Sequence, residues 1–192
     1  MPRRGEYMPK SALLIFLFLA TLVNSETDTL KPKLGTHAMI ALTVTSTAFK
    51  QMQPIPEAYT CDGADRSPPL AWSNPPALAK SIVLICDDPD APRGTWVHWV
   101  VYDLPPTCKG LPEGVKKTET LPIEGKQGKN DFPEIGYNGP CPPGGTHRYF
   151  FKVYALDALL GLPPGKTKHE VEKAMKGHIL AQGELVGIYK RK

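Results

Sequence analysis

The sequence predicts a mostly-β fold, a β-sandwich with one or two short helices. Residues 96–102 and 147–156 alternate with the period of two that is typical of strands. The 21 prolines are spread over the connections between such stretches, as expected of a sandwich built from short strands. With 192 residues, the chain is long enough for one domain with a sizeable core.

The first 25 residues have the pattern of a secretory signal peptide. Basic residues precede the apolar run 12–23, and the small residue Ser25 follows it. This run is shorter than the roughly 20 residues of a membrane-spanning helix. We therefore expect residues 1–25 to be removed and the protein to be exported, periplasmic or secreted, and not integral to the membrane. The alternative is that the uncleaved segment anchors the chain in the membrane.

The domain is expected to begin after a short leader. Residues 26–38 are polar and aperiodic and indicate a flexible leader. The domain then occupies residues 39–192, with a first strand over 39–49, where Thr and Val alternate with other residues. Residues 54–69 form a long loop with its own turn residues, and 70–72 form a short strand.

Two consecutive strands are predicted between residues 81 and 102. The apolar, β-branched run 81–86 indicates a buried strand that ends in an acidic turn at 87–90. The next strand is expected to carry four residues on one face: Trp96, His98, Val100 and Tyr102. The pair of strands thus combines a cluster of carboxylates with a histidine that lies among aromatic residues.

A rigid loop leads into another strand. Residues 136–145 contain so many prolines and glycines that they form neither a helix nor a sheet ladder. In the strand that follows, His147 and Tyr149 are two residues apart and are expected side by side on one face. Functional side chains are often carried in this way, on loops held by a scaffold.

The remaining segments are predicted as surface turns, a helix and a closing strand. Residues 107–114 indicate a surface turn region, and 125–132 are polar and expected to be mobile. A Thr and a Glu three residues apart predict a capping box at the start of a helix over 167–175, with Lys168 exposed. Residues 181–189 close the domain as a strand.

Several motifs resemble those of a known family. The chain contains DPDAP (88–92), a Trp-x-His strand start (96–98), GPCPPGGTHRY (139–149) and YALD (154–157). It resembles the phosphatidylethanolamine-binding proteins, also called Raf-kinase-inhibitor-like proteins, and most of all their bacterial and archaeal branch. The CDG and SPPL motifs of residues 61–72 also match. The resemblance implies Greek-key connections and a ligand pocket. Animal members have a further C-terminal helix over this pocket; none follows here, so we expect a more open site.

These residues are expected to form a pocket for an oxyanion. Imidazole N–H, tyrosine O–H and backbone N–H groups donate hydrogen bonds to a phosphate, while a carboxylate fixes the histidine tautomers. The resemblance assigns ligand binding to Asp88, Trp96, His98, Pro143, His147 and Tyr149. The residues themselves add the amide of Gly139 and the carboxylate of Asp90, although Asp90 also fits a loop-bracing role. The expected ligand is a small phosphate-bearing molecule or a phospholipid head group.

The cysteines allow more than one disulfide. Four cysteines permit three pairings, between which the sequence does not choose, and no CxxC motif is present. Cys61 and Cys141 lie in turn-rich loops beside the family motifs, and we favour this pair as the bridge in an oxidising compartment. Cys86 lies inside an apolar strand and is expected to be a buried thiol.

Other classes of function have less support. Ser67 is the residue to consider as a nucleophile, but no GxSxG, HExxH or P-loop motif is present, so we expect no enzyme, cofactor or metal. The family resemblance leaves an inhibitor of a serine protease or kinase as the alternative, and a regulatory role or a homodimer remains open. Without residues 1–25 the chain has 20 basic and 18 acidic residues, a net charge of +2, with no nucleic-acid-binding pattern.

We predict that the exported protein begins near Glu26, because a signal peptidase cleaves after a small residue that follows an apolar run of this length. N-terminal sequencing of protein from the membrane-free extracytoplasmic fraction tests this. Recovery of chains that begin at Met1 or Met8 from the membrane fraction would contradict it.

Overall fold

The computed structural model describes residues 40–191 of the chain. The signal peptide (1–25) and leader (26–38) expected from the sequence lie outside these residues, as do residues 39 and 192. In the described part, no helix has the length and apolarity needed to cross a membrane.

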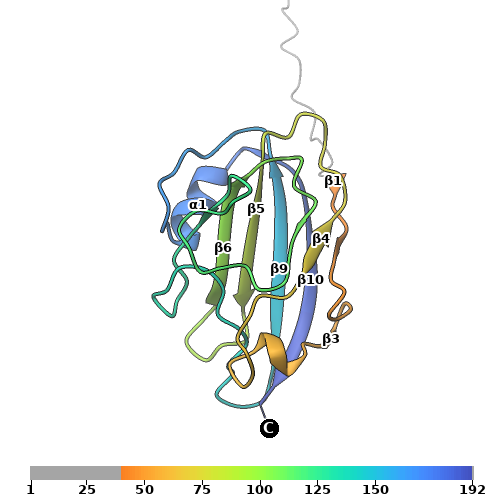
Figure 1. Ribbon diagram of the computed structural model, residues 1–192, viewed down its shortest axis with the longest axis vertical. Coiled ribbons are helices and arrows are strands. Elements are labelled where there is room, and N and C mark those ends of the chain that lie inside the picture. Colours follow the sequence, from red (N-terminus) through yellow and green to blue (C-terminus); the bar gives the residue numbers. More distant parts are fainter. Residues whose placement is uncertain (1–39, 192) are drawn as a thin grey trace, which may run out of the picture. The chain divides into compact units, whose positions relative to one another are not determined.

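The domain is built from two β-sheets, which confirms the mostly-β prediction. The large sheet has the strand order β1-β10-β9-β5-β6-β8, with β3 also paired to β10 (Figure 1). Its strands are β1 (Ile40–Ala41), β3 (Gln53–Pro54), β5 (Ser81–Asp88), β6 (Trp96–Leu104), β8 (Lys126–Gln127), β9 (Thr146–Leu156) and β10 (Ile179–Lys190). The small sheet has β2 (Val44–Thr45), β4 (Leu70–Trp72) and β7 (Gly110–Leu111). This order is compatible with Greek-key connections.

The main core lies between the two sheets. Val44 and Trp72 of the small sheet pack in one cluster with Leu84 and Phe151 of the large sheet. The predicted alternation in β9 is confirmed, because His147, Tyr149 and each second residue up to Ala155 are buried. A 3₁₀ turn, Glu57–Tyr59, adds Tyr59 to this core.

The helix α1 (Lys168–Met175) packs on the other side of the large sheet, beside β6 (Figure 1). Thr167 and Glu170 form the predicted capping box at its start. Lys168 is not the exposed residue that the sequence suggested. Its Nζ lies 2.5 Å from Oδ2 of the fully buried Asp87, so this lysine ties the helix to β5.

A β-bulge in β6 determines the direction of His98. In the pairing of β5 with β6, Cys86 lies opposite Trp99 and Asp87 lies opposite Val97, so His98 is an extra residue. Bulges are frequent beside functional sites because they turn a side chain out of the regular alternation.

The bulge makes the predicted face of β6 wrong. Trp96 and His98 line a cavity on the side of Tyr149. Val100 and Tyr102 instead belong to the smaller core beneath α1. A period of two cannot predict this change of side, because the extra residue shifts every later side chain to the opposite face.

The strand predicted over 39–49 is also wrong. The chain forms two short strands, β1 in the large sheet and β2 in the small one. Leu42 and Val44 are both buried in the main core while their neighbours are exposed. The alternation in the sequence therefore reflects burial in one core that two sheets share, and not a continuous strand.

Two segments predicted as turn or mobile surface contain ordered structure. Residues 107–114 include β7. Residues 125–132 include β8 and the fully buried Gln127, whose Oε1 accepts from Nε1–H of Trp99 at 2.7 Å. Its Nε2 donates to the carbonyl oxygens of Lys116 and Thr118, both at 2.7 Å. Polar residues are present here because they pair backbone groups inside the domain.

We predict that Gly183→Ala destabilises the domain by about 1 to 3 kcal/mol. A Cβ on Gly183 would overlap the carbonyl oxygen of Leu42, where the chain crosses from one sheet to the other. Urea unfolding measures the change. Gly144→Ala is the matched control, because its Cβ would meet no atom within 4 Å, and its effect should stay within about 0.5 kcal/mol. Equal stability of the two variants would contradict the prediction.

Candidate functional site

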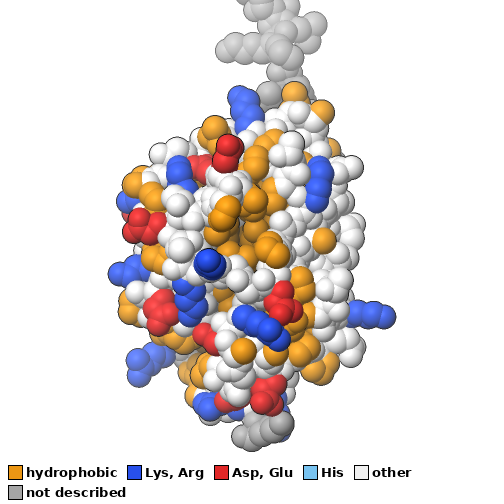
Figure 2. Space-filling model, in the orientation of Figure 1, with side chains coloured by type: hydrophobic (Ala, Val, Ile, Leu, Met, Phe, Trp, Pro, Cys, Tyr) orange, Lys and Arg blue, Asp and Glu red, His pale blue; other side chains and the backbone are white. Residues whose placement is uncertain are grey.

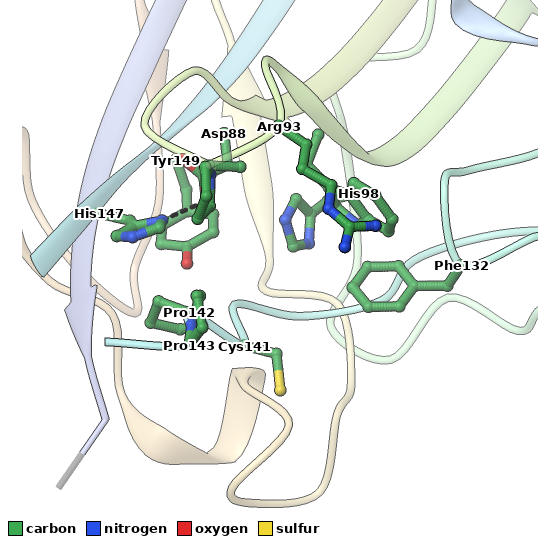
Figure 3. A pocket seen from close by; sticks show the side chains of 12 residues that line it. Asp88, Arg93, His98, Phe132, Cys141, Pro142, Pro143, His147 and Tyr149 are labelled. Atoms are coloured by element: carbon green, nitrogen blue, oxygen red, sulfur yellow. Dashed lines mark hydrogen bonds and ion pairs between the residues drawn. The ribbon is translucent and has the colours of Figure 1, made fainter. Parts of the chain in front are cut away.

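A cavity of about 410 Å³ lies where β5, β6 and β9 meet the loop 136–145 (Figure 3). It brings together six of the residues expected from the sequence: Asp88, Trp96, His98, Pro143, His147 and Tyr149. Several of these side chains are polar and converge on an otherwise apolar cavity, as in most small-molecule sites.

His147 is held by a buried carboxylate. Its Nδ1 lies 2.7 Å from Oδ2 of Asp88, and both side chains are almost completely buried. The other oxygen of Asp88 accepts from the backbone N–H of Asp90 at 2.8 Å. A carboxylate at Nδ1 requires a hydrogen on that nitrogen, so a neutral His147 carries its lone pair on Nε2.

His98 is held by the backbone. Its Nδ1 lies 2.7 Å from the carbonyl oxygen of Asn138, so Nδ1 is the donor and a neutral ring again has its lone pair on Nε2. Burial lowers the pKa of His98, and the carbonyl of Asn138 and the charge of Asp88 oppose this effect only in part. The ring packs edge-to-face on Tyr149, with 5.2 Å between ring centroids.

Tyr149 contributes an unpaired hydroxyl. Within residues 40–191 its Oη is the one buried side-chain polar atom without a hydrogen-bond partner. Burial, followed by the charge of Asp88, raises the pKa of this phenol well above its usual value, so it remains a donor. A buried donor without a partner costs about 1 to 3 kcal/mol of folding stability. Tyr149, which carries this donor, lines the cavity.

Arg93 and Phe132 are among the lining residues that were not assigned to the site from the sequence. Both side chains face the cavity (Figure 3). Among the described residues, Arg93 has no hydrogen bond or ion pair. Phe132 packs edge-to-face on Trp96 and on His98, with centroids 5.5 and 5.4 Å apart. Arg93 directly follows the DPDAP motif, so the sequence could have indicated it as a site residue. No local motif indicates Phe132.

Two expected site residues do not line the cavity. Asp90 instead binds Arg148, with Oδ1 2.7 Å from Nη2 and Oδ2 2.9 Å from Nε. This pairing lowers the pKa of Asp90 to about 2, so the residue braces the turn. The N–H of Gly139, expected to be free for an anion, donates to Oδ1 of Asp65 at 2.6 Å. Partners elsewhere in the fold use both groups, and for Asp90 this is the loop-bracing role that the sequence also allowed.

A disulfide joins the two loops beside the cavity. Cys61 and Cys141 are bonded, with 5.4 Å between their Cα atoms, which is the pair favoured from the sequence. Cys141 lines the cavity. Cys86 is a buried free thiol, and burial raises its pKa well above the usual value, as expected of an unreactive core residue.

Ser67, the nucleophile considered from the sequence, does not line the cavity. The hydroxyl of Ser67 is buried away from it and accepts from the N–H of Val115 at 2.9 Å. In the described range, no three His, Cys, Asp or Glu side chains are grouped so that they could hold a metal ion.

A second hollow is larger but chemically simpler. It has about 690 Å³ and is lined by the segment 111–123, with Lys116 as its one charged residue. Figure 2 shows apolar side chains gathered near the middle of one face, with charges of both signs scattered around them. Because the smaller cavity has the convergent titratable groups, it is the candidate site.

Comparison with known proteins identifies the family. The family model described as phosphatidylethanolamine-binding protein matches residues 45–190. The chain belongs to the phosphatidylethanolamine-binding protein family. It is 52% identical over 144 residues to a UPF0098 protein of Methanothermobacter thermautotrophicus, covering 75% of this chain and 95% of that protein. It is 53% identical over 152 residues to a UPF0098 protein of Aquifex aeolicus, covering 77% and 88%. These relatives place it in the bacterial and archaeal branch.

Solved structures of phosphatidylethanolamine-binding proteins show the same fold. A homologue from Chlamydia trachomatis has a TM-score of 0.73 and 46% identity, with 79% of this chain and 99% of that chain covered. Escherichia coli YbcL, described as a member of the mammalian family, has a TM-score of 0.74 and 33% identity, with the same coverage. The expectation of this family from the motifs is therefore confirmed.

We predict that His98 makes the domain less stable as the pH falls below neutral. Because burial lowers its folded pKa, the unfolded chain takes up the proton first, near its usual value of about 6.5. The free energy of unfolding therefore falls from about pH 6.5 down to the folded pKa, by about 1.4 kcal/mol for each unit of the shift. Urea unfolding between about pH 7.5 and 5 measures this fall.

His98→Asn is the comparison, because asparagine keeps an N–H for the carbonyl of Asn138 and does not titrate. Its stability should depend less on pH over this range. The same slope in the wild type and in the variant would show that His98 does not contribute.

Proposed function

We propose that this protein binds small phosphate-bearing ligands, free or as the head group of a phospholipid, and does not catalyse a reaction. The observation that carries the proposal is the unpaired hydroxyl of Tyr149, a buried donor in a cavity that also contains Arg93. An oxyanion supplies the missing acceptor and a partner for the cation.

The charges around the cavity favour an anion. Asp88 is the carboxylate that lines it, and its two oxygens are already engaged by His147 and by a backbone N–H. Arg93 has no such partner among the described residues. A guanidinium binds phosphate through two parallel N–H groups, so Arg93 is well suited to the mouth of the site.

A hydrogen bond between a histidine ring and a phosphate needs a hydrogen on one of the two groups. In their neutral forms, both rings have hydrogen on Nδ1 and offer a lone pair on Nε2. A fully deprotonated phosphate group has no hydrogen for these atoms. Either the phosphate keeps a hydrogen or an imidazole gains one on binding. For inorganic phosphate or a phosphate monoester, whose second pKa is about 6, affinity therefore rises as the pH falls towards that value.

The aromatic and proline residues shape the remainder of the cavity. Trp96, Phe132 and Pro142 form apolar walls that reduce the contact of the polar groups with water. Hydrogen bonds to an anion are stronger where water is excluded. The prolines also fix the loop before binding, which reduces the entropy cost of association.

We predict that Tyr149→Phe weakens binding of phosphoethanolamine or inorganic phosphate by roughly 10- to 150-fold, the value of one hydrogen bond to a charged group. The stability of the free domain should stay equal or rise, because the substitution removes a buried hydroxyl that has no partner. Calorimetric titration and urea unfolding measure the two effects.

Tyr154→Phe is the matched control. It makes the same chemical change on the same strand, but Tyr154 packs against the core beneath α1. Its affinity should equal that of the wild type. The proposal fails if the wild type binds neither ligand, or if the two variants bind equally well.

A further inference from the structure

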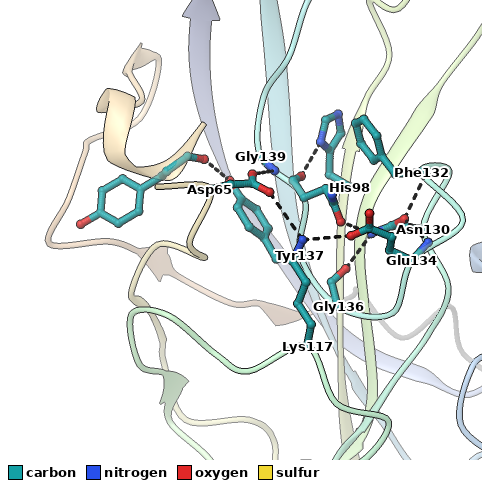
Figure 4. A network of polar contacts seen from close by, with 11 residues as sticks. Asp65, His98, Lys117, Asn130, Phe132, Glu134, Gly136, Tyr137 and Gly139 are labelled. Atoms are coloured by element: carbon teal, nitrogen blue, oxygen red, sulfur yellow. Dashed lines mark hydrogen bonds and ion pairs between the residues drawn. The ribbon is translucent and has the colours of Figure 1, made fainter. Parts of the chain in front are cut away.

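One peptide group, between Asn138 and Gly139, is held on both sides (Figure 4). Its carbonyl oxygen accepts from Nδ1–H of His98 at 2.7 Å, and its N–H donates to Oδ1 of Asp65 at 2.6 Å. The N–H of Asn138 also donates to the carbonyl oxygen of His98 at 3.0 Å. The orientation of this peptide therefore decides which ring nitrogen of His98 has the hydrogen.

Asp65 is itself fixed in place. Its Oδ2 lies 3.5 Å from Nζ of Lys117, which lies 3.1 Å from Oε2 of Glu134 (Figure 4). The segments are also in close contact, because a Cβ on Gly139 would overlap the carbonyl oxygen of Tyr59. The segments that carry Asp65, Lys117 and Gly139 thus meet beside His98.

Asn130 holds the side chain of Asn138, next to the same peptide. Its buried amide uses its whole hydrogen-bonding capacity. Oδ1 accepts from the N–H groups of Phe132 and Glu134, both at 3.0 Å. Nδ2 donates to the carbonyl oxygen of Gly136 at 2.9 Å and to Oδ1 of Asn138 at 2.8 Å. One side chain therefore places both Asn138 and the aromatic ring that packs on His98.

We infer that Asp65 and Asn130 are positioning residues that fix His98 as a hydrogen-bond acceptor towards the ligand, and that the ligand atom meeting His98 carries a hydrogen. The first half concerns the free protein, and the second rests on the proposed phosphate site. If Asp65 is removed, the N–H of Gly139 loses its acceptor, and the peptide is free to turn its carbonyl away from the ring. Nδ1 of His98 then lacks a fixed acceptor, so the hydrogen is no longer held on that nitrogen.

A fixed acceptor at His98 affects which anion the cavity prefers. Phosphate near neutral pH keeps at least one hydrogen, whereas sulfate, of the same shape, has none. A site with a fixed acceptor therefore prefers phosphate, because a sulfate oxygen at that position would face a lone pair. One neutral hydrogen bond is worth about 0.5 to 1.5 kcal/mol, so the preference attributable to His98 is about 3- to 10-fold.

The first experiment is a long-range ¹H–¹⁵N correlation spectrum of the histidine rings of the free protein. The wild type should show His98 with hydrogen on Nδ1. Asp65→Ala should show a mixture of tautomers or hydrogen on Nε2, while Asp65→Asn, whose side-chain oxygen still accepts from Gly139, should resemble the wild type. Asn130→Ala should change the His98 signals in the same direction.

Asp157→Ala is the matched control, because Asp157 binds Nδ1 of the exposed His178 at 2.7 Å, away from the cavity. It should change the signals of His178 and not those of His98. The wild-type spectrum alone tests the tautomer, so the inference stays falsifiable even where a variant does not fold. Hydrogen on Nε2 of His98 in the wild type would overturn it, as would an unchanged spectrum in Asp65→Ala.

The second experiment is titration of the same proteins with inorganic phosphate and with sulfate. The wild type should prefer phosphate, and Asp65→Ala should lose the about 3- to 10-fold share of that preference that His98 contributes, while Asp65→Asn keeps it. An equal preference in the wild type and Asp65→Ala would overturn the ligand half. If the spectra behave as expected but neither anion binds, the proposed function fails and the positioning role stands.

Discussion

The cavity depends on side-chain hydrogen bonds that replace secondary structure in the loop 128–145. Buried backbone groups must be paired, and this loop has too many prolines and glycines to pair them in a ladder. Asn130 supplies partners through both ends of its amide, and one oxygen of Asp65 accepts from the N–H of Gly139. Part of the wall of the cavity is therefore positioned by two side chains that do not line it.

The end of β5 connects the cavity with the opposite face of the sheet. Asp87 and Asp88 are consecutive, so their side chains point to opposite faces. Both are buried, and a buried carboxylate is tolerated only when it is paired. Lys152 and Lys168 neutralise Asp87 beneath α1, while His147 pairs with Asp88 in the cavity. One strand end thus anchors the helix and orients a histidine of the site.

The scaffold and the cavity differ in how completely their polar groups are used. Around the cavity, Asp65, Asp90 and the amide of Gly139 are bonded to other parts of the domain. Inside it, Tyr149 has no partner and Arg93 has none among the described residues. The donors that have no partner, and not the residue types alone, indicate which groups a ligand would have to supply. Gly139 and Asp90 look like ligand groups in the sequence because their partners are distant in the chain.

The sequence by itself determined the strands with a clear period, the capped helix and the family, because these depend on local patterns and short motifs. It also selected six residues of the candidate site, since they lie within three motifs. Only the tertiary structure decided that β6 contains a bulge at His98, that residues 39–49 divide between two sheets, and that Arg93 and Phe132 face the cavity. Each of these depends on pairing or packing between segments far apart in the chain, and a local pattern has no information about its distant partner.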